Sequence, residues 1–287
     1  VIYSNTILNA SILEKLAVSG ALIITHVHEM SFWINHLSRK ELELLKNNTN
    51  YFFTASRAVS ETLEDFGIVK SEVTYPVYVF ADDQVQLVEK DQFSLRNLLD
   101  LPPDSILIGA CGSENFRKGK DWFVPISVCV LNSLRHLNIH FVWIGGSTSY
   151  EIEFDKRQSG YEDRIHFIEY LSQAHLYFHE LNLFLMISRE DPFPIVNIET
   201  GILGIPIISF ENNGGTQELL EDDPSLLVPY GNLQLMAERI ISLLTDSQML
   251  HEKGKFIQTK IKNHYMKDQV ADNITSKLFE IFSNFRK

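Results

Sequence analysis

Short runs that are apolar on both faces recur along the chain, and most are separated from the next by a helical pattern. Strands of this kind are typical of a parallel sheet covered by helices, since a sheet with one face in water alternates apolar and polar residues. Strand, helix and strand in succession also predict right-handed crossovers. The sequence therefore predicts an α/β fold. After a short apolar run over residues 1–3, the expected strands cover residues 21–30, 51–56, 72–80, 106–113, 140–146, 164–170, 181–188, 205–210 and 225–230.

The pattern is interrupted by Pro102 and Pro103 and restarts at Ile106, so we place a domain boundary there. Residues 1–100 form one doubly wound domain, and a second begins at residue 101. Its helices are expected from Asp121 to about His136, near Gln173, over 194–204 and from near Gln217. The last helix should bury a stripe formed by Val270, Ile274, Leu278, Ile281 and Phe285.

Composition excludes several classes of protein. The length of 287 residues and 45% hydrophobic content suit a soluble globular protein, and a net charge of −12 argues against a nucleic-acid-binding surface. No apolar run could span a bilayer, and two cysteines, Cys111 and Cys129, are too few for a disulfide framework or a structural zinc site. A cytoplasmic protein is expected. The first residue is valine, which suggests a fragment or a processed product.

Basic residues gather after the strand 106–113, in the segment GSENFRKGKD. Gly112 permits a tight turn, and Arg117, Lys118 and Lys120 give an acidic protein the local positive charge that a diphosphate needs. A solvated basic loop is the alternative. Gly119 suggests a close approach or a simple turn, and Gly145–Gly146 would let a base or a neighbouring loop come near.

Two carboxylates, Asp191 and Glu199, stand eight residues apart across a loop that enters a helix. Pro194 suits the first helical turn, so Asp191 should lie on the loop and Glu199 inside the helix. Both could then face the crevice outside the carboxyl ends of the strands, where a carboxylate can hold a ribose diol. The alternative is an acidic helix start that the helix dipole stabilises.

A third element, Gly214-Gly215-Thr216, precedes a short helix. Its free N–H groups could receive a phosphate, and Thr216 could equally cap the helix.

In the amino-terminal domain, His26 and His28 end a strand and share one face. No third zinc ligand is evident, so we expect one histidine to face the interdomain cleft and the other to lie near the core.

Together these segments resemble retaining glycosyltransferases of family 4, with the GT-B fold of two Rossmann-like domains. The resemblance rests on FRKGKD, SREDPFPIVNIE and NNGGTQEL, and Asp191 and Glu199 match the first and last positions of the family's Glu-x7-Glu pattern. It implies direct roles in the reaction for His28, Lys118 and Asp191. Lys118 would hold the donor diphosphate, Asp191 the sugar and Glu199 the ribose hydroxyls, and residues 267–287 would form a helix that crosses back from a donor domain over 101–266. The complete donor-binding set is Gly112, Ser113, Arg117, Lys118, Asp191, Glu199, Gly214, Gly215 and Thr216.

The chain departs from the family in two ways. Ser113 stands where an arginine is usual, for which Arg117 could substitute. We also expect the amino-terminal domain to be partial, because the family's first strands and glycine-rich loop have no counterpart before Val1. The resemblance implies transfer of a sugar from a nucleoside diphosphate sugar to a glycan or lipid-linked acceptor, without a metal or a bound cofactor, in polysaccharide assembly. The enzyme would be cytoplasmic or peripheral to the inner face of the membrane. A catalytically silent donor-binding fragment and a sugar-nucleotide epimerase or hydrolase are the alternatives.

Overall fold

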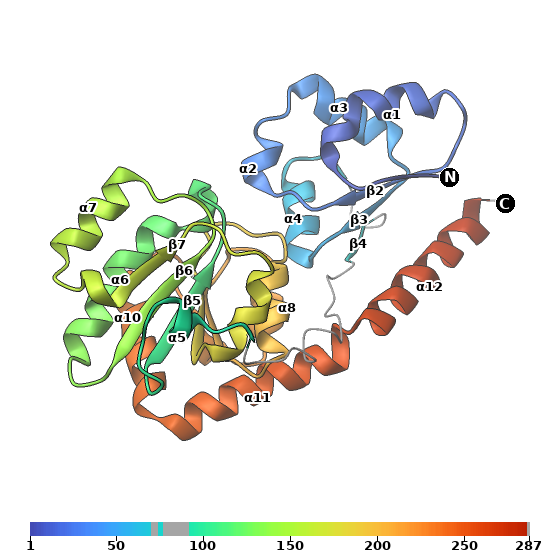
Figure 1. Cartoon of the computed structure of the whole chain (residues 1–287). Coiled ribbons are helices and arrows are strands. Elements are labelled where there is room, and N and C mark those ends of the chain that lie inside the picture. The colour runs from blue at the N-terminus through green and yellow to red at the C-terminus, as the bar shows by residue number, and fades with distance from the viewer. Residues whose placement is uncertain (70–73, 77–91, 286–287) are drawn as a thin grey trace.

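The computed structural model describes residues 1–69, 74–76 and 92–285, and two parallel sheets dominate it (Figure 1). The first sheet has the order β1-β2-β3-β4 and the second has the order β10-β9-β8-β5-β6-β7. The prediction of parallel α/β architecture is confirmed. In the first sheet the strands are β1 (Ile2–Ser4), β2 (Ile23–Val27), β3 (Tyr51–Thr54) and β4 (Thr74–Pro76).

Helices connect these strands. They are η1 (Ile7–Asn9), α1 (Ala10–Ala17), α2 (Ser31–Ile34), α3 (Arg39–Asn48) and α4 (Arg57–Asp65). Polar residues fix where they begin: the Ser38 side chain accepts from the N–H of Glu41 in a capping box, and Ser56 accepts from the N–H of Val59. The strand expected over 72–80 is present at β4, and the rest of that range lies outside the described residues.

The strand order of the second sheet reverses at β5, which pairs in parallel with β6 on one side and with β8 on the other. In an open parallel sheet, such a reversal opens a crevice beyond the carboxyl ends of the two strands. Its strands are β5 (Ile106–Cys111), β6 (Ile139–Ile144), β7 (Ile165–Ile168), β8 (Leu183–Met186), β9 (Ile207–Phe210) and β10 (Leu227–Val228).

The α-helices that accompany this sheet are α5 (Leu95–Leu98), α6 (Lys120–Ser133), α7 (Tyr150–Gln158), α8 (Ile195–Gly201), α9 (Thr216–Leu220), α10 (Leu233–Thr245) and α11 (Ser247–His264). The 3-10 helices are η5 (Phe116–Lys118), η6 (Glu162–Arg164), η7 (Ala174–Glu180) and η8 (Pro224–Leu226). Two expectations need correction. The helix predicted to reach His136 ends at Ser133, and the one near Gln173 is 3-10.

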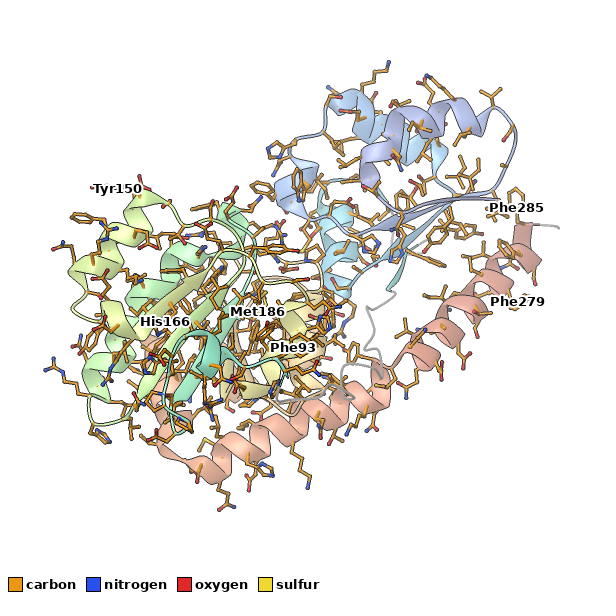
Figure 2. All side chains as sticks on the ribbon, viewed as in Figure 1. Phe93, Tyr150, His166, Met186, Phe279 and Phe285 are labelled. Atoms are coloured by element: carbon orange, nitrogen blue, oxygen red, sulfur yellow. The ribbon has the colours of Figure 1, made fainter. Side chains whose placement is uncertain are left out.

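The last helix, α12 (Lys267–Phe285), packs on the first sheet. Val270 and Ile281 form one buried cluster with Leu22, Ile24 and Phe53, and Ile274 and Leu278 pack against it. The expected stripe is therefore present except at Phe285, which is 51% exposed. Phe279 is also exposed and lies on the outer side of the helix (Figure 2).

No helix in the described part of the chain is both long and apolar enough to cross a bilayer.

Candidate active site

The candidate site lies at the crevice between β5 and β8, where two loops meet. η5 follows β5, and its N-cap is Asn115, whose side chain accepts from the N–H of Arg117 at 2.9 Å. Gly119 ends the turn at φ +74°, and the carbonyl oxygen of Ile187 leaves no room for a Cβ there. Both readings of Gly119 therefore hold, because it turns the chain and also admits the loop that follows β8.

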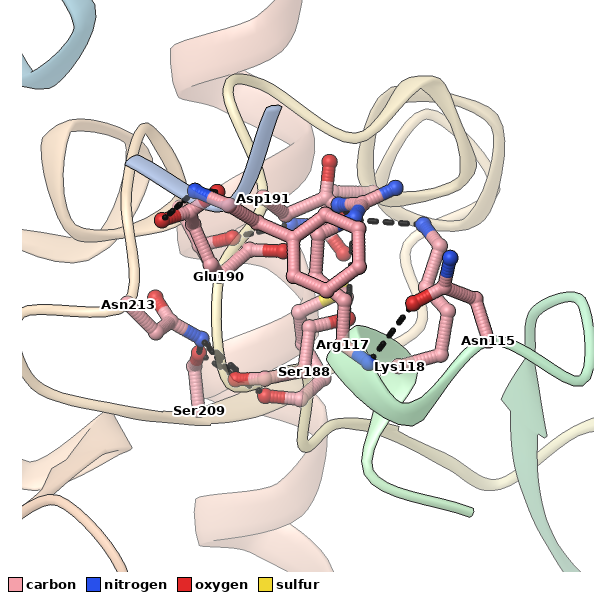
Figure 3. Close-up of polar contacts among 12 residues, drawn as sticks. Asn115, Arg117, Lys118, Ser188, Glu190, Asp191, Ser209 and Asn213 are labelled. Atoms are coloured by element: carbon pink, nitrogen blue, oxygen red, sulfur yellow. Dashed lines mark hydrogen bonds and ion pairs between the residues drawn. The ribbon is translucent and has the colours of Figure 1, made fainter. Parts of the chain in front are cut away.

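The basic residues of η5 converge on Asp191. The Nζ of Lys118 lies 2.5 Å from Oδ2 of Asp191, and Nη1 of Arg117 lies 3.3 Å from the same oxygen (Figure 3). Arg117 also donates to the carbonyl oxygen of Glu190 at 2.5 Å. The Lys118 and Arg117 side chains are each only 16% exposed, and that of Asp191 is 7% exposed. Two cations are thus held with little solvent at one point of the crevice.

The turn at Gly214 is joined directly to Asp191. Asp191 donates its N–H to the carbonyl oxygen of Asn213 at 2.7 Å, and Gly215 donates to the carbonyl oxygen of Asp191 at 3.1 Å. Gly214 has φ +119°, and the carbonyl oxygen of Asp191 occupies the space that a Cβ would need. Asn213 in turn donates to Oγ of Ser209 at 3.0 Å (Figure 3).

Two expectations at this turn are wrong. The N–H of Gly215 is not free for a phosphate, because it donates to the carbonyl oxygens of Asp191 and Pro192. Thr216 does not cap α9 with its side chain, since the N-cap is Gly215 and the buried hydroxyl of Thr216 accepts from Nδ2 of Asn197 at 3.0 Å. The turn is a rigid connection to the Asp191 loop.

Glu199 lies in α8, whose N-cap is Pro194, while Asp191 lies on the preceding loop. The Glu199 side chain is 20% exposed, and burial raises its pKa. Burial also raises the pKa of the Cys111 thiol at the end of β5 to about 12, with the charge of Glu199 raising it further and that of Lys118 lowering it. Glu199 and Lys118 therefore both lie close enough to the Cys111 thiol to influence its pKa. Nδ1 of His175 approaches Glu199 to 3.9 Å.

The glycines after β5 and β6 let the two loops approach each other. A Cβ on Gly145 would lie 2.8 Å from the carbonyl oxygen of Gly112, and the N–H of Glu114 blocks one on Gly146. A Cβ on Gly112 would in turn lie 3.1 Å from Cγ of Lys118. Of the two readings of Gly145 and Gly146, the structure supports the approach of a neighbouring loop. Ser113, beside Gly112, is exposed.

Lys120 is not part of this basic group, contrary to expectation. It is 4% exposed, and its Nζ donates to the carbonyl oxygens of Gly145, Gly146 and Ser147 at 3.3, 2.8 and 2.9 Å. Burial lowers its pKa, while the charges of nearby glutamates oppose that shift. Its ammonium group thus ties the loop after β6 to the start of α6.

The rings of His26 and His28 lie in contact at the end of β2, with their centroids 4.0 Å apart and their planes tilted by 41°. His26 packs against Phe53, and its Nδ1 lies 2.8 Å from the hydroxyl of Tyr3, while Nε2 of His28 lies 2.9 Å from Oδ1 of Asn5. Burial lowers the pKa of His26 to about 3 and also lowers the pKa of His28. Both rings are therefore neutral at physiological pH. No cluster of three metal-ligating side chains is found within the described ranges.

Sequence reasoning missed two neighbours of Asp191. Both carboxylate oxygens of Glu190 accept from the N–H of Phe32, at 3.1 and 3.2 Å, so the loop after β8 touches the first domain. Arg189 is stacked between Phe116 and Trp122, 3.7 and 3.9 Å from the two ring centroids, and pairs with Asp121. The sequence signal for Glu190 and Arg189 was their position directly before Asp191. The direction of a side chain in a loop cannot be predicted from such a position.

A cavity of about 490 Å³ adjoins this loop between the two domains. Met30 and Arg57 line it from the first domain, and Glu190, Gly214 and Glu218 line it from the second. Lys118, Asp191 and Glu199 do not line it. The cavity therefore adjoins the Gly214 turn without reaching the Asp191 carboxylate or the cation of Lys118.

Comparison with known proteins agrees with this arrangement. Residues 104–246 match the family described as glycosyl transferases group 1. The O-antigen biosynthesis glycosyltransferase WclY of Escherichia coli is 27% identical over 134 residues, which is 46% of this chain but only 36% of that protein. Spore coat protein SA of Bacillus subtilis is 26% identical over 91% of this chain and 73% of its own length.

Solved structures share the whole architecture. HepE of Anabaena, crystallised with UDP, superposes with a TM-score of 0.84 at 18% identity, over 97% of this chain and 78% of its own. Sucrose-phosphate synthase of Thermosynechococcus elongatus superposes with a TM-score of 0.81 at 18% identity, over 99% of this chain and 74% of its own. The predicted fold class is confirmed: the chain has the GT-B fold of glycosyltransferases, and its residues 104–246 are similar to the glycosyl transferases group 1 family.

Proposed function

We propose that the chain is a glycosyltransferase that moves a sugar from a nucleoside diphosphate sugar to a hydroxyl acceptor, with retention at the anomeric carbon, in polysaccharide or glycoconjugate assembly. One observation carries the proposal, namely the convergence of Arg117 and Lys118 on Asp191 in a sheltered crevice. A diphosphate needs such a pair of cations. The name of WclY and the UDP bound to HepE point to the same chemistry.

The donor would lie across the crevice, with its diphosphate on Lys118 and Arg117. Binding then requires a change of partner, because both cations contact Asp191. Once the diphosphate takes over the cations, the Asp191 carboxylate is released to accept hydrogen bonds from the sugar. Glu199, whose side chain is partly buried, would accept from the ribose diol. Gly112 and Ser113 would follow the diphosphate with their backbone, and the Gly214 turn would border the sugar.

In this mechanism the leaving group is a diphosphate whose negative charge grows as the glycosidic bond breaks. Fixed cations that face this charge lower the barrier, and electrostatic stabilisation of this kind is usually the largest contribution to catalysis. The departing phosphate oxygen takes the proton of the acceptor hydroxyl, so no side-chain base is needed. His28 is neutral because burial lowers its pKa, and it would serve as a hydrogen-bond donor beside the sugar.

We also propose that residues 1–100 supply the acceptor side and residues 101–266 the donor side, with 267–287 crossing back to the first domain. The packing of Val270 and Ile281 against the first sheet supports this division for the described part of that helix. A glycan or a lipid-linked glycan is the acceptor in this proposal. Its hydroxyl would enter from the interdomain side of the Asp191 loop.

Calorimetry with uridine, guanosine and thymidine diphosphates tests the donor site. One of the three should bind, and Lys118→Met should weaken that nucleotide at least tenfold, because a charge-assisted contact to phosphate is worth roughly 1.4 kcal/mol or more. Lys255→Met, which alters an exposed lysine of α11, is the matched control. If none of the three binds to a folded chain, the proposal is wrong.

Product analysis separates the reaction classes. NMR of the anomeric proton should show that the product keeps the configuration of the donor when an acceptor is present. Release of free sugar without an acceptor would instead indicate a hydrolase, and a changed sugar nucleotide an epimerase. Binding without turnover would indicate a donor-binding module.

A further inference from the structure

Two carboxylates of the second domain hold backbone N–H groups of the first. Glu190 accepts from the N–H of Phe32 with both oxygens, at 3.1 and 3.2 Å. Glu218 accepts from the N–H of Ala58 at 3.1 Å and from Nε of Arg57 at 3.3 Å. We call these five residues the interdomain latch.

The positions of both carboxylates favour strong hydrogen bonds. Phe32 and Ala58 lie in the first turns of α2 and α4, where N–H groups have no partner within their own helix, and in the longer α4 the helix dipole also favours a negative charge. Glu218 is 6% exposed and Glu190 is half-buried, so solvent screens these contacts less than it screens a surface ion pair. The latch is therefore a set of charge-assisted hydrogen bonds between the two domains.

On the second domain, the latch carboxylates extend from the candidate donor site itself. Glu190 directly precedes Asp191, and its carbonyl oxygen accepts from Arg117. Glu218 lies in α9, shortly after the Gly214 turn, and that turn is bonded to the backbone of Asp191 on both sides. A movement of the first domain therefore pulls on both segments that carry the Asp191 contacts.

We propose that the interdomain latch couples closure of the first domain to the geometry of the donor site, with Glu190 as the main positioning residue. The inference rests on the function proposed above. In the closed chain, Glu190 fixes the loop on which Asp191 meets Lys118 and Arg117. Release of Phe32 frees that loop, so that Asp191 can change partner as the donor enters or leaves. Glu190 acts through Asp191 and does not touch the reacting atoms.

Hydrogen–deuterium exchange at the amide of Phe32 tests the latch. Glu190→Ala should speed exchange at this amide about tenfold or more, the change expected when a charge-assisted hydrogen bond is lost. Glu190→Gln keeps one acceptor oxygen and should give a smaller increase. Glu252→Gln, at an exposed site on α11, should leave the amide unchanged.

Two measurements test the coupling between the latch and the donor site. One repeats the hydrogen–deuterium exchange with saturating UDP, and the other determines kcat and KM of the transferase reaction. UDP should speed exchange at Phe32 in the unaltered chain, because the diphosphate takes Lys118 and Arg117 from Asp191 and favours release of the loop. It should have little effect in Glu190→Ala, where this amide is already released. That variant should also lose kcat with little change in the KM for the donor, whereas a merely structural role would appear only as a lower unfolding temperature. Glu190→Gln should recover part of kcat.

Two results overturn the inference. One is exchange at Phe32 that is equally fast in the unaltered chain and in the Glu190 variants. The other is a response to UDP that survives in Glu190→Ala. If Glu190→Ala does not fold, Glu190→Gln and Glu218→Gln decide the matter by the same measurements. Failure of every nucleotide to bind the unaltered chain defeats the proposed function and with it the coupling, whereas exchange without nucleotide still judges the latch.

Discussion

Lys120→Met should destabilise the chain without weakening the donor nucleotide. The substitution keeps the length of the side chain but removes the ammonium group that donates to the carbonyl oxygens of Gly145, Gly146 and Ser147. Each hydrogen bond from a charged group contributes ~1.5–3 kcal/mol. The desolvation of the buried ammonium offsets several kcal/mol of the total from the three bonds. We expect a net loss of about 3 kcal/mol in the free energy of unfolding, from the balance of these contributions.

For a domain of this size, about 3 kcal/mol corresponds to a fall in Tm of roughly 6–12 °C, which scanning calorimetry resolves easily. UDP affinity, measured below the unfolding transition, should stay unchanged. Lys118→Met, two residues away, should do the reverse, since Lys118 faces Asp191 in the crevice. If Lys120→Met unfolds like the unaltered chain but loses UDP binding, our reading of Lys120 as a structural residue is refuted.

Three further substitutions test other parts of the structure. Gly214→Ala should abolish nucleotide binding measured by calorimetry, because a Cβ has no room there, whereas Gly231→Ala has a similar positive φ in open space and should cost only ~1–2 kcal/mol in urea unfolding. Burial lowers the pKa of His166 from 6.5 to about 4, so the unfolded chain takes up its proton first and stability should fall as pH drops from about 6.5 to 4; His166→Asn should flatten this loss in urea unfolding at several pH values. Ile281→Ala, at a buried position, should lower the free energy of unfolding by about 2–5 kcal/mol, and equal effects from Phe285→Ala at its exposed position would contradict the packing of α12.

The sequence was sufficient for the architecture because the strands carry their own signal. Runs such as 106–111 and 183–186 are short and apolar on both faces, a pattern typical of strands in a parallel sheet covered by helices. Prediction from the sequence was less reliable where a segment could form more than one kind of helix. The segment after Gln173 contains enough apolar residues for a helix, but only tertiary contacts decide that it winds as 3-10.

The site shows the same division. Lys118, Asp191 and the Gly214 turn could be brought together in advance, because the carboxyl ends of adjacent parallel strands meet at one edge. The hydrogen-bond partners of individual atoms could not be predicted from the sequence. Lys118 and Lys120 read alike in sequence, yet one faces a carboxylate and the other three carbonyl oxygens, since a turn at Gly119 separates their directions.

The cluster that joins α12 to the first sheet has a consequence for synthesis. Leu22, Ile24 and Phe53 leave the ribosome early, whereas Val270 and Ile281 emerge more than 200 residues later. During that interval, one face of the nascent sheet has no cover from α12 and offers an apolar surface to chaperones or to other unfinished chains. Completion of the amino-terminal domain is thus delayed until this helix has been translated.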